Sequence, residues 1–586
     1  MNHRRRIAVL SLMATMGLCA QASAATVTSS PLPGTPTALP KTQISFLGAP
    51  AGSLSAISVV GSSSGRHSGH LRSYSSAIGA SFLPSKPFTP GEHVSVHAKW
   101  ANAGKRTTVS TSFTVARPAV VSQGEFLPVA GTPADIQSFQ SRPDLHPPAV
   151  TVNEAAGAAS APGYIFATPF LGPGEWGPMI FDSAGNLVWF HPLPHGQDAA
   201  DFRTQVYEGK NALTWWQGKT LALGYGLGED VIMNANYRTL AVVKAGNGLQ
   251  ADEHEFAVTP QGSAFVLAYS PVQTSLQSAG GPASGLALDG VIQEIDIPTG
   301  LVMWEWHSLG HVGLSESYTP APAAATTPYD YLHINSLSVN SQGEILISGA
   351  NTWALYDISP RTGAIVWRLG GKKSTFALGA GVPFAYQQDA EWLGGYEVTL
   401  LDDEGAPAVK PPSRGEVVSL NTKARTAALV NQLVRTSGPL STSGQGDLQA
   451  LPDGGSMVGW GGLGNFTEFN AQGQEIFDAQ LPAGESSYRV YREAWSAQPT
   501  EAPTIIAEFN QSAATIYATC NGATTVYFWL LLTGPNAADL TVRSTTPMAG
   551  FETAITAPIE PFYEVRALSA SGRVLVTLTA SKAEAG

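Results

Sequence analysis

Residues 331–371 read YLHINSLSVNSQGEILISGANTWALYDISPRTGAIVWRLGG and contain four apolar runs separated by turn residues. Short apolar runs bounded by Gly, Asn, Ser and Pro are typical of β-strands joined by tight turns. The second half of the stretch, WALYDISPRTGAIVWRL, carries an Asp and a Gly-containing turn between two apolar runs. The stretch therefore predicts one four-stranded sheet, and His333 stands immediately before its first strand.

The same two halves recur along the chain. Further copies of the second half are MIFDSAGNLVWF (179–190), VIMNANYRTLAVVKA (231–245), VIQEIDIPTGLVMWEW (291–306), EVVSLNTKARTAALVNQL (416–433) and FTEFNAQGQEIFDAQL (466–481). Their spacing of roughly 50–60 residues is in the range expected of a propeller blade. The first unit lacks its leading strand, and SYRVYREAW (487–495) could supply it and close the ring, which would hide nearly all sheet edges. Stacked sandwich domains would not explain the regular alternation of the two halves.

The two ends of the chain also carry short alternating runs that predict β-structure. We therefore expect an all-β protein, in which a six-bladed β-propeller lies between an N-terminal immunoglobulin-like β-sandwich and a C-terminal β-sandwich. The expected boundaries are a signal peptide at 1–24, a linker at 25–40, the N-terminal sandwich at 41–116, an extended crossing segment at 117–160, the propeller at 161–496 and the C-terminal sandwich at 497–586.

The N-terminus has the three parts of a secretory signal. Arg4, Arg5 and Arg6 precede an apolar run over residues 7–18, and Ala22-Ser23-Ala24 is a small-residue cleavage site. The apolar run is too short to span a bilayer. The sequence predicts export to the periplasm or the extracellular space after cleavage near Ala24, by either the general or the twin-arginine route.

Charge and residue types restrict the partners and cofactors. The formal net charge is −12, which is a poor match for nucleic acid or anionic membranes. The histidines at 67, 70, 93 and 97 and the acids in LDDEG (401–405) do not show the full ligand spacing of a metal site. We expect no metal, no cofactor and no membrane span, and the sequence does not predict the oligomeric state.

Candidate site residues stand where the leading strands of successive units begin. His254, His333, Gln388 and Gln445 occupy equivalent positions, so we expect their side chains to meet at one mouth of the central channel, where ligand sites tend to lie. The two histidines could bind an anion, act as acid and base, or act as a nucleophile. The acids beside His254 either orient its imidazole or form a turn with one salt bridge. Asn335 and Asn351 are candidate ligand-binding residues, with strand capping as the alternative role of Asn335.

Several of these segments together resemble the arylsulfotransferase family. The matching motifs are DEHEF (252–256), YLHINSL (331–337), ISGANT (347–352), WRLGGKKS (367–374), YQQDAEWL (386–393), GDLQALPDGG (446–455) and VGWGG (458–462). The resemblance extends over roughly Phe139 to Gly586. It implies an exported sulfotransferase that is independent of 3′-phosphoadenylyl sulfate and has a six-bladed propeller. Such enzymes move a sulfuryl group from a phenolic sulfate ester to a phenol, through a transient sulfo-histidine.

The resemblance also assigns roles to residues. His254 and His333 match the two sulfate-binding histidines of the family. Gln388 stands where the family has its nucleophilic histidine, and Ala350 stands where it has a sulfate-binding arginine. Glutamine cannot form a sulfo-histidine, and alanine cannot make a charge-assisted contact.

These departures leave three functions open. The first is an arylsulfotransferase-like enzyme with altered chemistry at His254 or His333, acting on a small aryl sulfate and a phenol. The second is a catalytically inactive propeller that binds an anionic or aromatic ligand, or a partner, in the same channel. The third is an extracellular structural or adhesion protein, which rests on architecture alone. Turnover of an aryl sulfate ester would separate the first from the others.

Overall fold

The computed structural model of the protein describes residues 27–102, 105–121, 124, 126–405 and 407–580. In these residues the regular structure consists of β-strands and short 3-10 turns, so the all-β prediction is confirmed. No helix in the described part of the chain is long and apolar enough to cross a membrane. The predicted signal peptide at 1–24 lies outside the described residues.

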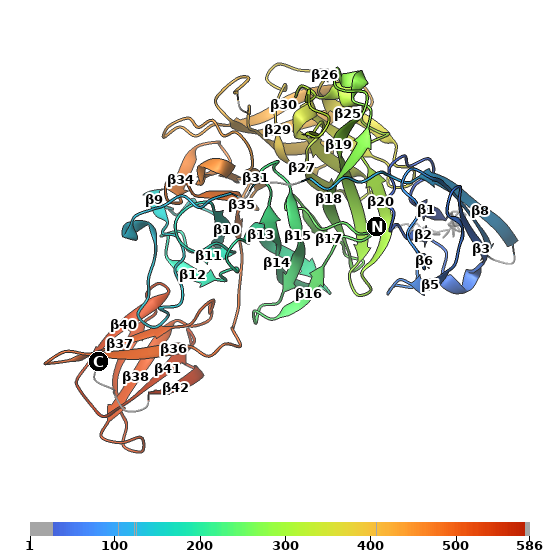
Figure 1. Cartoon of the computed structure of the whole chain (residues 1–586). Coiled ribbons are helices and arrows are strands. Elements are labelled where there is room, and N and C mark those ends of the chain that lie inside the picture. The colour runs from blue at the N-terminus through green and yellow to red at the C-terminus, as the bar shows by residue number, and fades with distance from the viewer. Residues whose placement is uncertain (1–26, 103–104, 122–123, 125, 406, 581–586) are drawn as a thin grey trace, which may run out of the picture.

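Six mainly antiparallel sheets occupy the middle of the chain (Figure 1). Each is built on four antiparallel strands that are consecutive in the sequence, except the first, which takes three consecutive strands and a fourth from the end of the region. The short strands β21 (Pro328–Tyr329) and β26 (Ala377–Leu378) add parallel pairings to the third and fifth sheets. The sheets are β10 (Tyr164–Phe170), β11 (Met179–Phe181), β12 (Leu187–Phe190) with β35 (Ser486–Glu493); β13 (Asp198–Tyr207), β14 (Lys210–Thr220), β15 (Gly226–Met233), β16 (Thr239–Val243); β17 (Phe256–Val258), β18 (Ser263–Thr274), β19 (Gly285–Asp296), β20 (Leu301–His307); β22 (Ile334–Val339), β23 (Ile345–Gly349), β24 (Ala354–Ile358), β25 (Ile365–Gly370); β27 (Gln388–Gly394), β28 (Glu397–Asp402), β29 (Arg414–Asn421), β30 (Thr426–Leu433); and β31 (Asp447–Ala450), β32 (Ser456–Gly459), β33 (Asn465–Phe469), β34 (Glu475–Gln480).

The pairing of β35 with β10 joins the end of the region to its beginning. Ile165 lies opposite Arg492, and Phe166 lies opposite Tyr491. The sequence predicted that 487–495 would supply the missing leading strand, and this pairing confirms it. This pairing is favourable because an unpaired β10 would expose a row of backbone donors and acceptors at a sheet edge.

Apolar cores lie between successive sheets and also between the sixth and the first. The core shared by the third and fourth sheets contains Trp306 and Tyr356, and that shared by the fifth and sixth contains Leu401 and Trp460. The sixth sheet packs on the first through a core that includes Phe466 and Phe181, whose ring centroids are 5.6 Å apart. The six sheets therefore pack face to face in a closed series, and burial of these faces supplies the main stabilising term.

The leading strands of the six sheets surround a common axis. A cavity of about 980 Å³ is lined by residues of β13, β17, β22, β27, β31 and β35, toward the ends of these strands. A second cavity is lined by residues at or just before the starts of β17, β22, β27, β31 and β35. The two cavities are the two ends of one axis, and residues that begin a leading strand share one of them.

Two pairs of sheets flank this middle region (Figure 1). The N-terminal pair joins the third middle sheet, where the Ser45 hydroxyl donates to the carbonyl of Val302 at 2.5 Å. The C-terminal pair joins the first middle sheet, where Asn521 exchanges two hydrogen bonds of 3.0 Å with the backbone of Phe190. The N-terminal pair comprises β1 (Thr28–Ser30), β2 (Ile44–Leu47), β6 (Gly79–Pro84), β5 (Gly69–Ser73) and β4 (Gly65–His67), β3 (Leu54–Gly61), β7 (His93–Asn102), β8 (Lys105–Thr114); the C-terminal pair comprises β36 (Thr504–Phe509), β37 (Ala514–Thr519), β40 (Glu552–Ala557) and β39 (Thr541–Pro547), β38 (Phe528–Gly534), β41 (Phe562–Leu568), β42 (Val574–Ala580).

Two segments that the sequence predicted as connections contain paired strands. Residues 28–30, within the predicted linker, form β1 and pair with β2. In the predicted crossing segment, β9 (Thr151–Glu154) pairs with β34 as a fifth strand of the sixth sheet. Both strands are short and lack a clear apolar alternation, so their pairing depends on neighbours that are distant in sequence.

Candidate functional site

The cavity at the start of the leading strands has a volume of about 520 Å³. It brings together the residues that the sequence placed in equivalent positions, although 55 or more residues separate each of them from the next in sequence. Its lining includes His254, His333, Ala350, Asn351, Gln388 and Gln445. Tyr386, Tyr488, Phe126 and Phe170 add aromatic surface. We call this the mouth cavity.

His254 lies in the short segment that precedes β17 and is 4% exposed. Its Nδ1 is 2.5 Å from Oδ2 of Asp252, which also accepts a 2.7 Å hydrogen bond at Oδ1 from the backbone N–H of Gly226. Burial alone would raise the pKa of Asp252, but the imidazole and these hydrogen bonds lower it below its usual range. Asp252 is therefore a carboxylate that holds Nδ1 and leaves Nε2 as the ring nitrogen for a ligand.

His333 precedes β22 and has a left-handed backbone conformation, with φ of 55°. Non-glycine residues rarely adopt this conformation without a local reason. Its Nδ1 is 2.6 Å from Oδ2 of Asp330. Burial lowers the pKa of His333, but the Asp330 carboxylate outweighs burial and the net effect is a raised pKa. His333 is thereby favoured as a cation in the cavity.

The two imidazoles form one group. Their ring centroids are 4.8 Å apart with an interplanar angle of 87°. Tyr488 connects their two segments, since its hydroxyl shares its single hydrogen between the carbonyls of His254 and Asn335, at 3.2 and 3.1 Å. Tyr269 donates to the carbonyl of Ile334 at 2.8 Å and fixes the backbone beside His333. Two nitrogen heterocycles, each held by its own carboxylate, therefore face the same space.

Gln388 and Ala350 line the same cavity as the imidazoles. Gln388 begins β27 and is 5% exposed, and Ala350 is 3% exposed in the turn after β23. The Ala350 backbone N–H donates to the carbonyl of His333 at 2.9 Å, which ties the two positions together. No lysine or arginine is among the described residues that line the mouth cavity. Any positive charge from these residues comes from the imidazoles.

The two asparagines have different positions. Asn351 lines the mouth cavity, and its Nδ2 donates to the carbonyl of Asp330 at 2.7 Å, which supports the partner of His333. Asn335 does not line the cavity. It is fully buried, and its Nδ2 donates to the carbonyl of Gln387 at 2.8 Å. Asn335 thus connects two leading strands behind the site.

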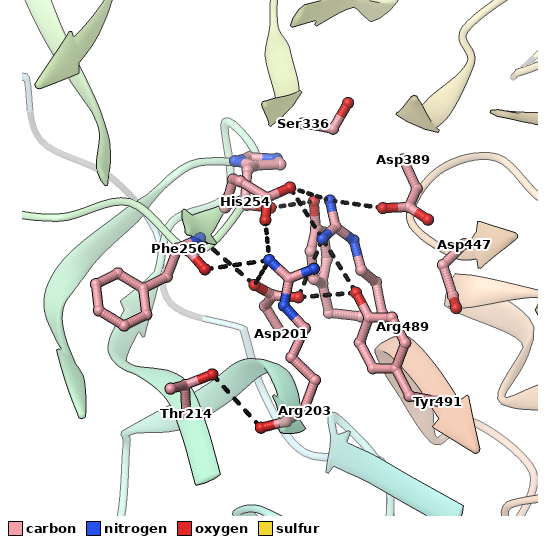
Figure 2. Close-up of polar contacts among 12 residues, drawn as sticks. Asp201, Arg203, Thr214, His254, Phe256, Ser336, Asp389, Asp447, Arg489 and Tyr491 are labelled. Atoms are coloured by element: carbon pink, nitrogen blue, oxygen red, sulfur yellow. Dashed lines mark hydrogen bonds and ion pairs between the residues drawn. The ribbon is translucent and has the colours of Figure 1, made fainter. Parts of the chain in front are cut away.

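A buried group of charges between the two cavities was not predicted from the sequence (Figure 2). Arg489 on β35 is fully buried, and its guanidinium lies 3.0 Å from Asp201, 3.1 Å from Glu255 and 3.2 Å from Asp389. Arg203 also pairs with Glu255. Burial raises the pKa of Asp201 to about 6 against the lowering effect of Arg203 and Arg489. The charged residues of SYRVYRE (487–493), in a strand that the sequence predicted to close the series of sheets, are the sequence signal that could have indicated this group.

These contacts place Arg489 directly behind the mouth cavity. The guanidinium carbon is 5.2 Å from the ring centroid of Tyr488, which lines the cavity. Asp389 follows Gln388 in the chain and lines the opposite cavity. The group of Arg489, Arg203 and their acids therefore separates the two ends of the axis with a set of ion pairs.

Two imidazoles, each held at Nδ1 by a carboxylate, thus lie at one end of a closed series of β-sheets in an all-β protein. Residues 203–481 match the family model for arylsulfotransferase (ASST). This part of the chain, which carries His254, His333, Ala350 and Gln388, belongs to the arylsulfotransferase family.

No curated protein matches the chain. Among solved structures, a protein of unknown function from Bacteroides caccae has 14% identity, covers 56% of this chain and 98% of its own, and has a TM-score of 0.35. A quinonprotein alcohol dehydrogenase-like protein from Bacteroides thetaiotaomicron has 10% identity, 94% coverage of both chains and a TM-score of 0.24. Sqt1 of Saccharomyces cerevisiae has 12% identity, covers 74% of this chain and 91% of its own, and has a TM-score of 0.27. At these TM-scores the structural similarities carry no argument about the site.

Proposed function

We propose that the protein binds an aryl sulfate ester in the mouth cavity and transfers its sulfuryl group to a phenol. The observation that carries this proposal is the pair of imidazoles, 4.8 Å apart and each held at Nδ1 by a carboxylate. Membership of residues 203–481 in the arylsulfotransferase family supports it. The aromatic lining of the cavity suits the aryl group of such an ester.

The two histidines have different roles in this proposal. His333, with its raised pKa, binds the sulfate oxygens as an imidazolium. His254 attacks the sulfur through Nε2, so a sulfur–nitrogen bond forms while the sulfur–oxygen bond to the aryl group breaks, and the leaving phenolate takes a proton from the His333 imidazolium. A second phenol then attacks the sulfur, the sulfur–nitrogen bond breaks to regenerate the His254 imidazole, and the phenol proton returns to His333. His254 thus acts as the nucleophile, a role that the glutamine at position 388 cannot perform.

Single and double histidine variants test the proposal. The wild-type chain is expected to release phenol from a chromogenic aryl sulfate in the presence of a phenol acceptor. The His254→Asn variant should lose transfer and any acid-labile adduct on the peptide that contains residue 254. The His333→Asn variant should keep the site of the adduct but form it more slowly. Equal release by the wild type and the doubly substituted chain would contradict the proposal.

A second function is favoured by a separate observation. Gln388 and Ala350 both line the cavity, so two positions that carry chemistry in the family are neutral here. Under this alternative the protein binds an anionic or aromatic ligand without turnover. Ligand-dependent thermal stabilisation of the wild type, combined with no release of phenol, would favour it.

We also propose that the six middle sheets are the blades of a six-bladed β-propeller and that the N-terminal sheets form an immunoglobulin-like sandwich. The apolar cores between successive sheets and the β10–β35 pairing support the first part. Export with cleavage near Ala24 is a further proposal, supported by Arg4–Arg6 and the apolar run that follows. N-terminal sequencing of the protein recovered from outside the cytoplasm would test it.

A further inference from the structure

The N-terminal pair of sheets carries a charge opposite to that of the whole chain. Residues 27–121 contain eight lysines and arginines and a single acid, Glu92, whereas the whole chain has 32 lysines and arginines and 44 acids. The family match begins at residue 203, and the proposed sulfuryl transfer uses no residue of this pair. A basic region in an acidic chain is typical of a surface that meets an anionic partner.

The one acid of this region does not reach the surface. Glu92 is 3% exposed, and its carboxylate accepts from the backbone N–H groups of Ser63, Ser64 and Thr89 at 2.9, 2.9 and 2.6 Å. Burial raises the pKa of Glu92, but these hydrogen bonds and one from the Ser64 hydroxyl outweigh burial and lower the pKa to about 2. Glu92 therefore stabilises a buried turn and does not neutralise the cations on the surface of the pair.

Three of the cations and a histidine share one face of the sheet formed by β4, β3, β7 and β8. Side chains at alternate positions of a strand, and at directly paired positions of neighbouring antiparallel strands, point to the same side of a sheet. The register therefore places Arg66 of β4, His97 and Lys99 of β7 and Arg106 of β8 on one side. All four side chains are exposed. We call this surface the outer basic face.

The outer basic face points away from the middle sheets. The opposite side of the same sheet buries Val94, Val96 and Trp100 in the core of the N-terminal pair. The other sheet of the pair, through β2 and β6, packs against β20 and lies between β20 and the outer basic face (Figure 1). Among the residues that the structure describes, no acid forms an ion pair with Arg66 or Arg106.

The remaining side chains of the face are mostly hydroxyls. The residues paired with His97 and Lys99 are Ser58, Ser110, Ser55 and Thr108. Hydroxyl groups both donate and accept hydrogen bonds, as the hydroxyls of a sugar do. Val60 is the one large apolar side chain among the described residues of this face. The face therefore lacks the aromatic and large apolar side chains that insert into bilayers or stack on bases.

We propose that the outer basic face binds an anionic polysaccharide. Its arginine and lysine side chains pair with sulfate or carboxylate groups of the polymer, and its serine and threonine hydroxyls bind the sugar hydroxyls. The inference goes beyond the proposed function, because it gives the N-terminal pair a partner of its own, away from the mouth cavity. Nucleic acid, an anionic membrane and the acidic part of a second copy of the chain are the competing occupants.

Binding of the full chain to immobilised polysaccharides tests the inference. We would measure the Kd for heparin, which is sulfated, for polygalacturonate, which is carboxylated, and for neutral dextran, at low and at raised salt. The wild type is expected to bind at least one anionic polymer and not dextran, and the preferred polymer identifies the anionic group.

The test variant combines Arg66→Ser, Lys99→Ser and Arg106→Ser. It should raise the Kd for the anionic polymer about tenfold or more, since it loses three charged contacts. The slope of log Kd against log salt concentration should fall by about 2–3, roughly one for each lost contact. Thermal unfolding of the variant checks that the fold is retained.

The matched control combines Lys210→Ser, Arg238→Ser and Lys423→Ser, which removes three exposed cations from the middle sheets. It should leave the Kd unchanged. Equal weakening in the two triple variants would overturn the inference, because net charge alone would then control binding. Failure of the wild type to bind either anionic polymer would also overturn it.

Two further measurements separate the competing occupants. Tighter binding of the wild type to duplex DNA or to phosphatidylserine vesicles than to the polysaccharides would contradict the inference. So would self-association, measured by sedimentation velocity, that is lost in the variant of the outer basic face. Release of phenol from an aryl sulfate should be equal in the wild type and this variant, so the outcome for the polysaccharide is separate from that for sulfuryl transfer.

Discussion

The guanidinium of Arg489 lies 3.2 Å from the carboxylate of Asp389, immediately behind the position where Gln388 faces the mouth cavity. Arg489 comes from the last strand of the ring and Asp389 from the fifth sheet. Asp389 has a left-handed backbone conformation, with φ of 49°. The contact therefore fixes a strained residue next to the site through a strand that closes the ring.

Replacement of Arg489 by methionine is expected to lower the free energy of unfolding by about 3–5 kcal/mol, since it leaves buried carboxylates without a partner. Denaturant unfolding of the whole chain would measure this loss. Arg566→Met is the control, because Arg566 pairs with Glu564 on a partly exposed surface and should cost less than about 1 kcal/mol. Similar losses in the two variants would show that the buried group does not stabilise the fold.

Anion binding should depend on pH through His333. The raised pKa favours its cationic form near neutral pH, so affinity for sulfate is expected to be highest below this pKa and to fall as pH rises through it. Asp330→Asn removes the carboxylate that raises the pKa, and should move the loss of affinity to lower pH. Titration with inorganic sulfate across pH in both chains would measure the shift. Identical pH profiles would assign the dependence to another group.

The double variant Gln388→His with Ala350→Arg places the family's residues back in the mouth cavity. We expect it to transfer the sulfuryl group at least about 10²-fold faster than the wild type, because each added group stabilises charge in the transition state. Release of phenol from a chromogenic aryl sulfate is the measurement. The single variants Gln388→His and Ala350→Arg serve as controls. A rate equal to that of the wild type would indicate that the cavity does not position an ester at these residues.

His307 joins the N-terminal sheets to the third middle sheet. It is buried, with Nδ1 2.8 Å from Asp289 and Nε2 3.1 Å from Glu305, and the hydroxyl of Thr37 donates to the same Asp289 at 2.5 Å. Burial lowers the pKa of His307, but the two carboxylates outweigh it and raise the pKa to about 10. The ordinary pKa in an unfolded chain is about 6.5.

The sign of this shift gives a prediction about stability. The contribution of the His307 imidazolium is fully present below about pH 6.5 and is lost as pH rises toward about 10. His307→Gln should lower the free energy of unfolding by about 3 kcal/mol at pH 6, and the difference from the wild type should shrink with rising pH. Thermal unfolding at several pH values would measure it, with the exposed His97 replaced by Gln as control. A difference that does not change with pH would contradict the role of the charge.

The local sequence predicted the sheets well because each blade-like unit carries its own signals. Apolar runs and Gly-containing turns mark the strands from Ile334 to Gly370, and the structure has four strands there. The sequence also predicted which strand pairs with Tyr164–Phe170. The first repeat unit has no leading strand, and the segment that begins near Ser486 is a strand that follows the last unit and belongs to no other unit. Short strands such as Thr28–Ser30 were missed because their pairing depends on distant neighbours rather than on their own pattern.

By itself, the sequence determined the all-β class, the repeated units and the alignment of His254, His333 and Gln388 at equivalent strand starts. These depend on local propensity and on period, which a single chain displays directly. The tertiary structure decided which side chains share a cavity: it brought Ala350, Gln388 and the two imidazoles together and moved Asn335 behind them. It also decided the partners of Arg489, because burial and the proximity of distant charges exist only after β35 has paired with β10.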